Sequence, residues 1–329
     1  MIDYFIMKNN ILEKITKTPL FVNKHAPKSL KELILPELTR NKLNYMVETK
    51  KLNHAIFVGK TSSGKTLTSL LLARELISKE DSGENFLFLN ASDDRGLDMI
   101  KQIIEPFCSK KIDNDKIKLI IIDEGKSITA KAQPIIANLM ENSVNTYFIL
   151  TVNDLNEISN AIQSRCSILY FPAFKKEEII VKLEEIVKKE KLNISKEILE
   201  IIIDMTERDL RQSINFLEAL SGKKSSISQE EIYEIFIQPN PVMVKKLLKK
   251  EKTLKDNLNI VSELVDKGFS SNDILLSILN YLMLLNDIDI SEKEKMRIFE
   301  IVSKYYIRVN QGTETKWQLY GCMIELYNN

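Results

Sequence analysis

The chain has 329 residues, of which 44% are hydrophobic and 28% are charged. This length is too great for one compact core and suits two or three domains, and the composition is typical of soluble globular proteins. The formal net charge is +1, so the charge of the whole chain predicts no nucleic-acid binding, and any such surface must be local. No apolar run is long enough to span a membrane, and we expect no signal peptide at the N-terminus.

The three cysteines, Cys108, Cys166 and Cys322, lie far apart in the sequence. Their spacing predicts neither a zinc site nor a disulfide framework, and it fits a reducing compartment. The basic residues are strongly biased, because only eight of the 47 are arginines. Each arginine is therefore informative, since its fork of donors offers a geometry that lysine lacks.

The first half of the chain alternates short apolar runs with helical stretches. Strands are expected at residues 54–59, 85–90, 118–123 and 146–152. A fifth short strand is expected around Tyr170, and a helix over residues 67–77. Continuous apolar strands separated by helices predict a parallel sheet that is covered on both faces, which is an α/β fold.

The pattern changes after Pro172, because nearly every segment from residue 175 onward has helical period. The proline-containing segment 239–241 interrupts this helical series and marks a second boundary. The expected domains are residues 1–172, 173–238 and 239–329.

Residues 59–66 read Gly-Lys-Thr-Ser-Ser-Gly-Lys-Thr and fill every fixed position of the phosphate-loop motif. The run follows a predicted strand and opens a predicted helix, which is the context that this motif requires. Backbone N–H groups and the helix N-terminus would bind phosphate, Lys65 would reach the β- and γ-phosphates, and the Thr66 hydroxyl would bind Mg²⁺. The residues expected to bind the nucleotide are Gly59, Lys60, Thr61, Ser62, Ser63, Gly64, Lys65, Thr66 and Leu67.

Two carboxylates, Asp123 and Glu124, end the apolar run at residues 118–123. Asp123 is predicted to hold Mg²⁺ through water, and Glu124 to polarise the attacking water. The alternative is a solvated acidic pair at an ordinary strand end, but the spacing of about 60 residues after the phosphate loop favours catalysis. Asn153 follows the next strand and is either a residue that positions water or a turn residue.

Two arginines have positions that suit nucleotide chemistry. Arg165 lies between a polar turn and an apolar run, and it could neutralise the γ-phosphate of a neighbouring subunit's nucleotide. Arg211 lies near the start of a helix in the second predicted domain and could sense phosphate. For each, the alternative is an ordinary solvated surface residue.

Four segments occur together in one order: Leu-Asn-Ala-Ser-Asp-Asp-Arg-Gly at 89–96, Asp-Glu at 123–124, Gln-Ser-Arg-Cys at 163–166 and Asp-Leu-Arg at 209–211. In this combination the chain resembles a small subunit of replication factor C, the sliding-clamp loader of eukaryotes and archaea. The resemblance extends to the C-terminal third, where three segments are similar to the family's helical collar. Among the paralogues it is most similar to the one called subunit 4 in yeast and subunit 2 in humans.

The resemblance implies a P-loop AAA+ domain, a small helical lid domain and an all-α collar domain. It implies a nuclear ring of five different AAA+ subunits, a hetero-pentamer with DNA-dependent ATPase activity. In this family, binding of ATP with Mg²⁺ opens the sliding clamp PCNA at primer–template DNA, and hydrolysis releases the clamp closed around the duplex. DNA would be held without regard to its sequence.

The resemblance also assigns residues. Gly64, Lys65 and Thr66 would bind ATP and magnesium. Asp123 and Glu124 would form the hydrolytic pair, Asn153 and Arg211 would be the two sensors, and Arg165 would be the arginine finger for a neighbour's ATP.

Further assignments concern the helix that follows Arg95. Ile104 and Phe107 are the apolar candidates for the clamp contact, with core packing as the alternative. Lys101 is the candidate for a DNA phosphate contact.

The chain departs from the family pattern at five places. Ala26 replaces an arginine that would approach the nucleotide, residues 60–63 replace Pro-Pro-Gly-Thr, and Gly125-Lys126 replaces Ala-Asp. Ala137-Asn138 stands where the family has a basic pair facing DNA, and Arg208 where it has glycine. These changes suggest weaker contacts with ATP and DNA, but they remove no catalytic residue.

Three functional hypotheses follow. The first is an active ATPase subunit of the clamp loader, which the retained Glu124 favours. The second is a structural ring member that binds ATP, supplies Arg165 to its neighbour and hydrolyses little. The third is a different P-loop machine, such as a branch-migration motor, against which the Ser-Arg-Cys segment and the collar-like C-terminus argue.

Overall fold

The computed structural model describes residues 20–77, 82–92, 97–113, 116–222, 231–232, 239, 241–248, 253–284, 291–312 and 316–328. The chain divides into two compact units, Met1–Lys224 and Ser225–Asn329. The expected boundary at 172/173 lies inside the first unit, and most of residues 223–240 lie outside the described residues. The division into domains 1–172, 173–238 and 239–329 therefore stays a prediction.

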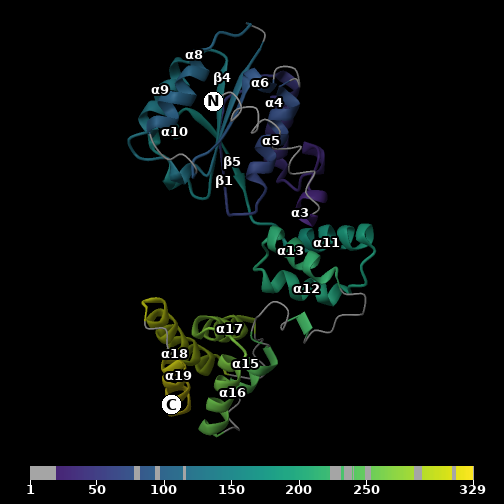
Figure 1. Ribbon diagram of the computed structural model, residues 1–329, viewed down its shortest axis with the longest axis vertical. Coiled ribbons are helices and arrows are strands. Elements are labelled where there is room, and N and C mark those ends of the chain that lie inside the picture. The colour runs from purple at the N-terminus through teal and green to yellow at the C-terminus, as the bar shows by residue number, and fades with distance from the viewer. Residues whose placement is uncertain are drawn as a thin grey trace. The chain divides into compact units, whose positions relative to one another are not determined.

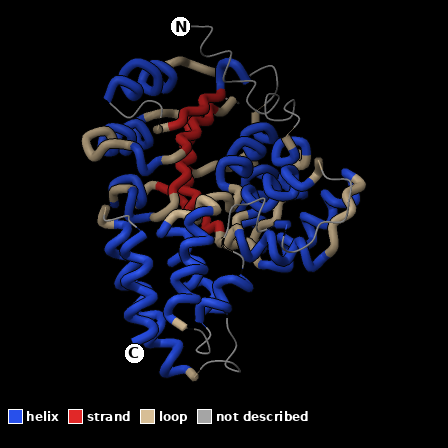
Figure 2. The backbone as a smooth tube through the Cα atoms, turned by 60° about the horizontal axis from the view of Figure 1, so that its bottom comes forward, coloured by secondary structure: helices blue, strands red, loops and turns tan. Residues whose placement is uncertain are grey.

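A single five-stranded sheet with the order β2-β3-β4-β1-β5 forms the centre of the first unit (Figures 1 and 2). Its strands are β1 (His54–Gly59), β2 (Phe86–Asn90), β3 (Lys118–Asp123), β4 (Thr146–Val152) and β5 (Cys166–Phe171). All neighbouring strands pair in parallel, so their carboxyl ends meet at one edge of the sheet. The pairing of Asn90 with Asp123 belongs to that edge. The predicted α/β fold with a parallel sheet is confirmed.

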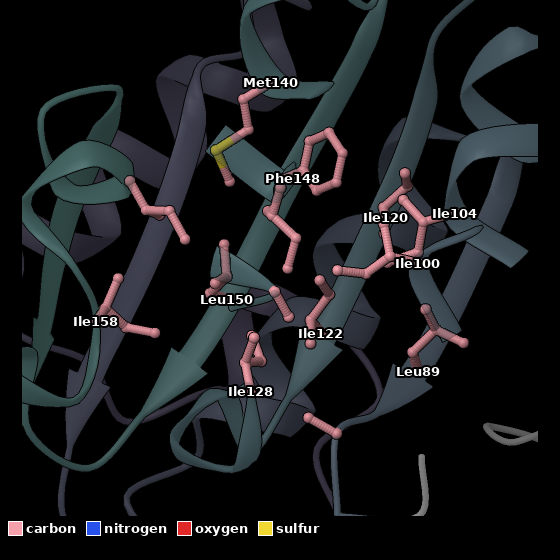
Figure 3. Packing of buried hydrophobic residues seen from close by; sticks show 14 of the residues in the cluster. Leu89, Ile100, Ile104, Ile120, Ile122, Ile128, Met140, Phe148, Leu150 and Ile158 are labelled. Carbon is pink, nitrogen blue, oxygen red and sulfur yellow. The ribbon is translucent and has the colours of Figure 1, made fainter. Parts of the chain in front are cut away.

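Both faces of the sheet are buried, as the uninterrupted apolar strands predict. Successive side chains alternate between faces, so Ile120 and Ile122 pack with Phe148 and Leu150 in one cluster (Figure 3), while Ile121 packs in the other. The interior positions of β1, β2 and β3 are all apolar because each of these strands has two covered faces.

Helices cover the two faces. The helices of this part are α3 (Phe21–Lys24), α4 (Glu37–Thr49), α5 (Lys65–Leu76), α6 (Ser82–Asn85), α7 (Leu97–Met99), α8 (Glu105–Ser109), α9 (Gln133–Asn142) and α10 (Asn160–Gln163). Between them lie 3₁₀ helices η1 (Leu30–Glu32), η3 (Gly125–Ser127) and η4 (Leu155–Glu157), and a π-helical segment η2 (Ile100–Ile104). Helices α4 and α5 pack on one face, and η2, α8, α9 and α10 on the other (Figure 1).

A buried lysine fastens α8 to the sheet. Lys118 begins β3 and is 2% exposed, and its ammonium donates to the carbonyl oxygens of Phe107 at 2.9 Å, Cys108 at 2.8 Å and also Lys110. Burial lowers the pKa of this ammonium below its usual value of 10.5. The three carbonyls belong to the end of α8 and the residues just after it, so the lysine satisfies acceptors that the helix leaves open.

Three further helices complete the first unit: α11 (Lys176–Glu190), α12 (Lys196–Met205) and α13 (Leu210–Leu220). Their apolar faces pack together through Ile179, Leu183, Ile202 and Leu217, which are fully buried. The short helix α3 packs against α13, where the Phe21 N–H donates to a Glu218 carboxylate oxygen at 3.0 Å.

A second contact ties the same N-terminal segment to α11. Glu190 receives a hydrogen bond from the Lys24 ammonium at 2.9 Å, and its other oxygen lies 2.6 Å from His25 Nε2. These bonds, led by the one from Lys24, hold the pKa of Glu190 below its usual value. Residues 20–25 are thus held by α11 and by α13, and α13 also carries Arg211 and is capped by Asp209.

The second unit is helical in its described residues. It consists of α15 (Pro241–Leu248), α16 (Leu254–Asp266), α17 (Ser271–Leu284), α18 (Glu292–Asn310) and α19 (Lys316–Asn328), drawn from green to yellow in Figure 1. Its core includes Val261, Ile278, Val302 and Leu319. The Thr253 hydroxyl caps α16 by accepting the Asp256 N–H, as expected for threonine before a helix. In the described parts of the chain, no helix combines the length and apolar character that a bilayer crossing requires.

Candidate nucleotide-binding site

The phosphate loop connects β1 to α5, and its two glycines have different structural reasons. A Cβ on Gly59 would lie 2.0 Å from the Phe171 carbonyl oxygen on β5, so only glycine fits that close approach. Gly64 has φ +88°, and a Cβ there would meet no atom within 4 Å. Its left-handed backbone therefore requires glycine, while the space beside it stays open.

Lys65 is buried at the start of α5 and is 8% exposed. Its ammonium donates to the carbonyl oxygens of Gly59 at 2.7 Å and Lys60 at 2.8 Å, and to Asn153 Oδ1 at 3.3 Å. Burial lowers the pKa of Lys65 below its usual value of 10.5, and the nearby carboxylate of Asp123 opposes that shift. The structure thus brings Lys65 into contact with Asn153, which lies about 90 positions later in the sequence.

Asp123 lies at the end of β3 and is bound by two hydroxyl groups through the same oxygen. Thr66 Oγ1 donates to Asp123 Oδ1 at 2.8 Å, and the Thr151 hydroxyl donates to that oxygen as well. Glu124 follows with a left-handed backbone, φ +54°, and an exposed side chain. Its N–H donates to Thr151 Oγ1 at 3.2 Å. The predicted metal pair Thr66 and Asp123 is therefore in direct contact.

A polar contact joins the phosphate loop to α13. Asp209 is the N-cap of this helix, where Oδ1 accepts the Gln212 N–H at 3.0 Å. Its other oxygen accepts the Ser62 hydroxyl at 2.8 Å. Ser62 and Arg208 both have left-handed backbones, φ +60° and +65°. Both stand where the family pattern has glycine, so the chain keeps the glycine conformation with other residues.

A pocket of about 250 Å³ lies beside the phosphate loop. Its lining includes Ala26 from the N-terminal segment, residues 62–68 from the loop and α5, and Arg211 and Ile214 from α13. Leu67, predicted to touch the nucleotide, is among these residues. The structure therefore gathers residues 62–67 of the predicted nucleotide-binding set and the predicted sensor Arg211 around one cavity, whereas residues 59–61 do not line it.

Arg165 is not among the residues that line this described pocket. Its guanidinium donates to Glu141 Oε2 at 2.5 Å and to the Ala161 carbonyl oxygen at 2.7 Å. The arginine is thus paired within its own chain at the surface, next to β5.

The candidates for the clamp contact, Ile104 and Phe107, lie in the core of the first unit. Ile104 is fully buried and Phe107 is 7% exposed, and both pack in the cluster on one face of the sheet (Figure 3 shows Ile104). Their burial favours the alternative of core packing, and the clamp contact stays a prediction. Lys101 is exposed, as a phosphate contact requires. Residues 93–96, with Arg95, lie outside the described residues.

Ala137 is also buried, at 4% exposure, whereas Asn138 is exposed. Of the two positions at which the family has a basic pair, only 138 therefore lies at the surface of this chain.

Three family descriptions match the chain in order. ATPase family associated with various cellular activities (AAA) matches residues 55–173, the RCF1/5-like AAA+ ATPase lid domain residues 182–221, and the replication factor C C-terminal domain residues 239–325. Replication factor C small subunit of Methanococcus maripaludis is 32% identical over 93% of this chain and 98% of its own length. The chain belongs to the replication factor C family. Its predicted membership and its predicted function as a clamp-loader subunit are confirmed.

Eukaryotic replication factor C subunits have a similar sequence identity to this chain. Replication factor C subunit 4 of Saccharomyces cerevisiae is 30% identical, over 93% of this chain and 95% of its own. Replication factor C subunit 4 of Encephalitozoon cuniculi is 29% identical, over 92% and 95%. A solved structure of a Thermotoga maritima RuvB mutant has a TM-score of 0.54 at 16% identity, covering 77% of this chain and 91% of that one. That likeness shows the fold alone.

Proposed function

We propose that this replication factor C subunit binds ATP with Mg²⁺ beside its phosphate loop and hydrolyses it while the loader is on primer–template DNA. The observation that carries this proposal is the convergence of Lys65, Thr66, Asp123 and Asn153, which come from α5 and the ends of β3 and β4. Membership in an AAA family and in replication factor C supports nucleotide use within a multi-subunit complex. DNA dependence and the individual roles of the residues are the new part.

The residues present fit a nucleotide with its metal. Among the described residues, the hydrogen bonds of the Lys65 ammonium go to two carbonyl oxygens and one side-chain amide oxygen, which are neutral acceptors. Phosphate oxygens could replace these neutral partners and would form stronger, charge-assisted bonds. Thr66 and Asp123 supply the hard oxygen ligands that Mg²⁺ prefers. Bound Mg²⁺ would neutralise the charge of the phosphates.

The remaining polar groups have distinct tasks in this proposal. Glu124 is exposed at the end of β3, where its carboxylate can orient water for attack. Asn153 Oδ1 accepts a hydrogen bond from Lys65 in this structure. When Lys65 binds phosphate instead, this oxygen is released and can hold the attacking water. Arg211 would bind phosphate from the lid side of the pocket. Arg165 would stabilise charge on a neighbour's nucleotide.

The partners follow from the same proposal. We place the chain in a nuclear hetero-pentamer with other replication factor C subunits, acting on PCNA and on primer–template DNA without sequence preference. The relatives of this chain from two eukaryotes, Saccharomyces cerevisiae and Encephalitozoon cuniculi, support the nuclear assignment. Lys101, exposed on η2, is the proposed phosphate contact.

The decisive experiment is Lys65→Ala in the reconstituted complex. DNA-stimulated ATP hydrolysis should fall, because the variant loses the ammonium that would bind the β- and γ-phosphates. Lys42→Ala is the matched control, since Lys42 is exposed on α4 and does not line the pocket. If Lys65→Ala left ATP turnover and clamp loading unchanged, the subunit would be a structural ring member instead. The left-handed Ser62 and the alanine at position 26 favour that second function.

A further inference from the structure

A threonine hydroxyl next to the acidic pair is not explained by the phosphate-loop or sensor motifs. Thr151 lies on β4, the strand beside β3, and is 2% exposed. Its hydroxyl donates to Asp123 Oδ1, and it accepts the N–H of Glu124 at 3.2 Å. One buried side chain therefore contacts both residues of the predicted hydrolytic pair.

The chemistry of this group suits it to hold two neighbours at once. A hydroxyl has one donor and two acceptor positions, so it can donate to a carboxylate and accept from an amide at the same time. Asp123 Oδ1 also receives Thr66 Oγ1 at 2.8 Å, and these two donors together fix the rotation of the carboxylate.

The Glu124 side of the contact is equally specific. Glu124 has φ +54°, a left-handed conformation that is strained for a residue with a Cβ. The bond from its N–H to Thr151 favours that peptide orientation, which sets the direction in which the Glu124 side chain leaves the strand. A Cβ on the next residue, Gly125, would lie only 3.0 Å from Val152 Cγ1, so glycine avoids a close contact there.

We propose that Thr151 is a positioning residue for ATP hydrolysis, because its single hydroxyl aligns the Asp123 carboxylate and the Glu124 backbone together. This inference rests on the proposed hydrolytic function of the subunit. Thr151 itself does not line the nucleotide pocket and acts through its two neighbours. It should therefore affect the rate of turnover more than the affinity for ATP.

The test compares Thr151→Val with Thr151→Ser. Valine keeps the shape and the strand preference but removes the hydroxyl, whereas serine keeps the hydroxyl and loses one methyl group. Both variants, with Glu124→Gln as the reference for lost hydrolysis, are assembled into the complex whose other subunits carry an alanine in place of their phosphate-loop lysine. ATP turnover then reports on this site alone.

For Thr151→Val we expect kcat to fall about tenfold to a hundredfold, with KM for ATP changed by less than about threefold. Thr151→Ser should restore kcat to within about threefold of the original protein. Nucleotide binding, measured with a fluorescent ATP analogue, and thermal unfolding of each complex give the readouts that a merely structural role would move.

Each outcome decides between the two proposals. If Thr151→Val turns over ATP at the original rate while Glu124→Gln does not, the positioning role is wrong and the hydrolytic function stands. If both threonine variants lose ATP binding and unfold at lower temperature, the threonine side chain acts through packing rather than through its hydroxyl, and the positioning role is again wrong. If Glu124→Gln changes nothing, the subunit does not hydrolyse ATP, and both proposals fall.

Discussion

His54 uses both of its ring nitrogens in the fold. Nε2 donates to the Met140 carbonyl oxygen at 3.0 Å, and Nδ1 accepts the Phe148 N–H at 3.1 Å. Only the neutral imidazole can make both bonds, because the protonated ring has two donors and no acceptor. Burial accordingly lowers the pKa of His54 below its usual value of 6.5, although the bond to Met140 opposes the shift.

This residue predicts a dependence of stability on pH. The unfolded chain binds the His54 proton more tightly than the folded chain does, so protonation favours unfolding. The contribution of neutral His54 is present above pH 6.5 and is lost as the pH falls through the lower folded pKa, with a slope of at most about 1.4 kcal/mol per pH unit. Urea denaturation between pH 7.5 and pH 5 at steps of about half a unit measures it.

His54→Asn is the matched variant, because it removes the titrating ring from the same strand position. The difference in the free energy of unfolding between the two proteins should shrink as the pH falls. A difference that is constant across that range would show that His54 does not titrate with folding.

At the scale of single residues, the sequence predicted the candidate residues of the site but not their hydrogen-bond partners. The motif named Lys65 and Thr66, since their spacing from the glycines is part of the chemistry. Thr151 was missed, although a polar residue within an apolar strand is a usable signal of a buried hydrogen bond. The contact between Ser62 and Asp209 was not predictable, because it joins residues about 150 positions apart whose motifs say nothing of each other.

Helix α13 and the phosphate loop share one carboxylate, and this contact connects the two elements. Asp209 caps the helix with Oδ1 and binds the loop hydroxyl of Ser62 with Oδ2. A change of backbone at either element would therefore pull on the other. Such a contact couples the position of Arg211, two residues further on, to the shape of the loop.

The shared carboxylate predicts a graded loss of stability. Asp209→Ala removes the cap and the loop contact, and it should lower the free energy of unfolding by about 1–2 kcal/mol. Ser62→Gly removes only the loop contact and relieves the left-handed backbone, so its cost should be smaller, near zero. Chemical denaturation followed by circular dichroism measures both.

Gln212→Ala is the control for α13, since Gln212 is exposed and its bond to Asp209 comes from the backbone. It should unfold close to the original protein. Equal losses for the Gln212 and Asp209 variants would contradict a capping role for the carboxylate.

The elements themselves were largely predictable. The ends of β1, β3 and β4 agree with the expected ranges 54–59, 118–123 and 146–152, because in each the apolar run stops at a polar or glycine residue. Helix α5 begins at Lys65, two residues before the expected start, since the loop itself turns into the helix.

The segment that follows Arg95 was harder to predict. It forms α7, a π-helical stretch and α8 in succession, with Pro106 at the start of α8. Proline lacks the N–H that continues an α-helix, which accounts for a break near this position. Apolar spacing could not say which face would be buried, and the burial of Ile104 and Phe107 favours core packing, the alternative to the clamp contact.

The surface ion pair of Arg165 and Glu141 bears on how this chain would act in the assembled complex. In the chain by itself the guanidinium already has a carboxylate partner at 2.5 Å, with the Glu141 side chain 61% exposed. Exposed pairs of this kind contribute at most about 1 kcal/mol. A neighbour's phosphate, with more charge and a bidentate geometry, can therefore take over the arginine.

We predict opposite results for the two members of this pair. Arg165→Ala should lower ATP turnover of the complex most clearly when this chain also carries Lys65→Ala, because the remaining loss then comes from the neighbour's site. Glu141→Gln should leave that turnover unchanged or raise it, since the arginine is released. Steady-state hydrolysis on primer–template DNA provides the measurement, and unaltered turnover with Arg165→Ala would reject the finger assignment.

Family membership was predictable from short motifs, because the segments at 123–124, 163–166 and 209–211 occur together in one chain and in one order. The sequence could not give the number of compact units that the described residues form. Helices α11, α12 and α13 belong to the unit of the sheet, and they are tied to it through α3 and the bond between Ser62 and Asp209.

Lys118 limits how freely this chain could change its basic residues. The chain uses lysine for most of its positive charges, and at exposed sites arginine would serve equally well. At position 118 three carbonyl oxygens converge on one small tetrahedral head group, and a planar guanidinium offers no such set of directions. Replacement of lysine by arginine should therefore not be tolerated at position 118, even though no motif includes this residue.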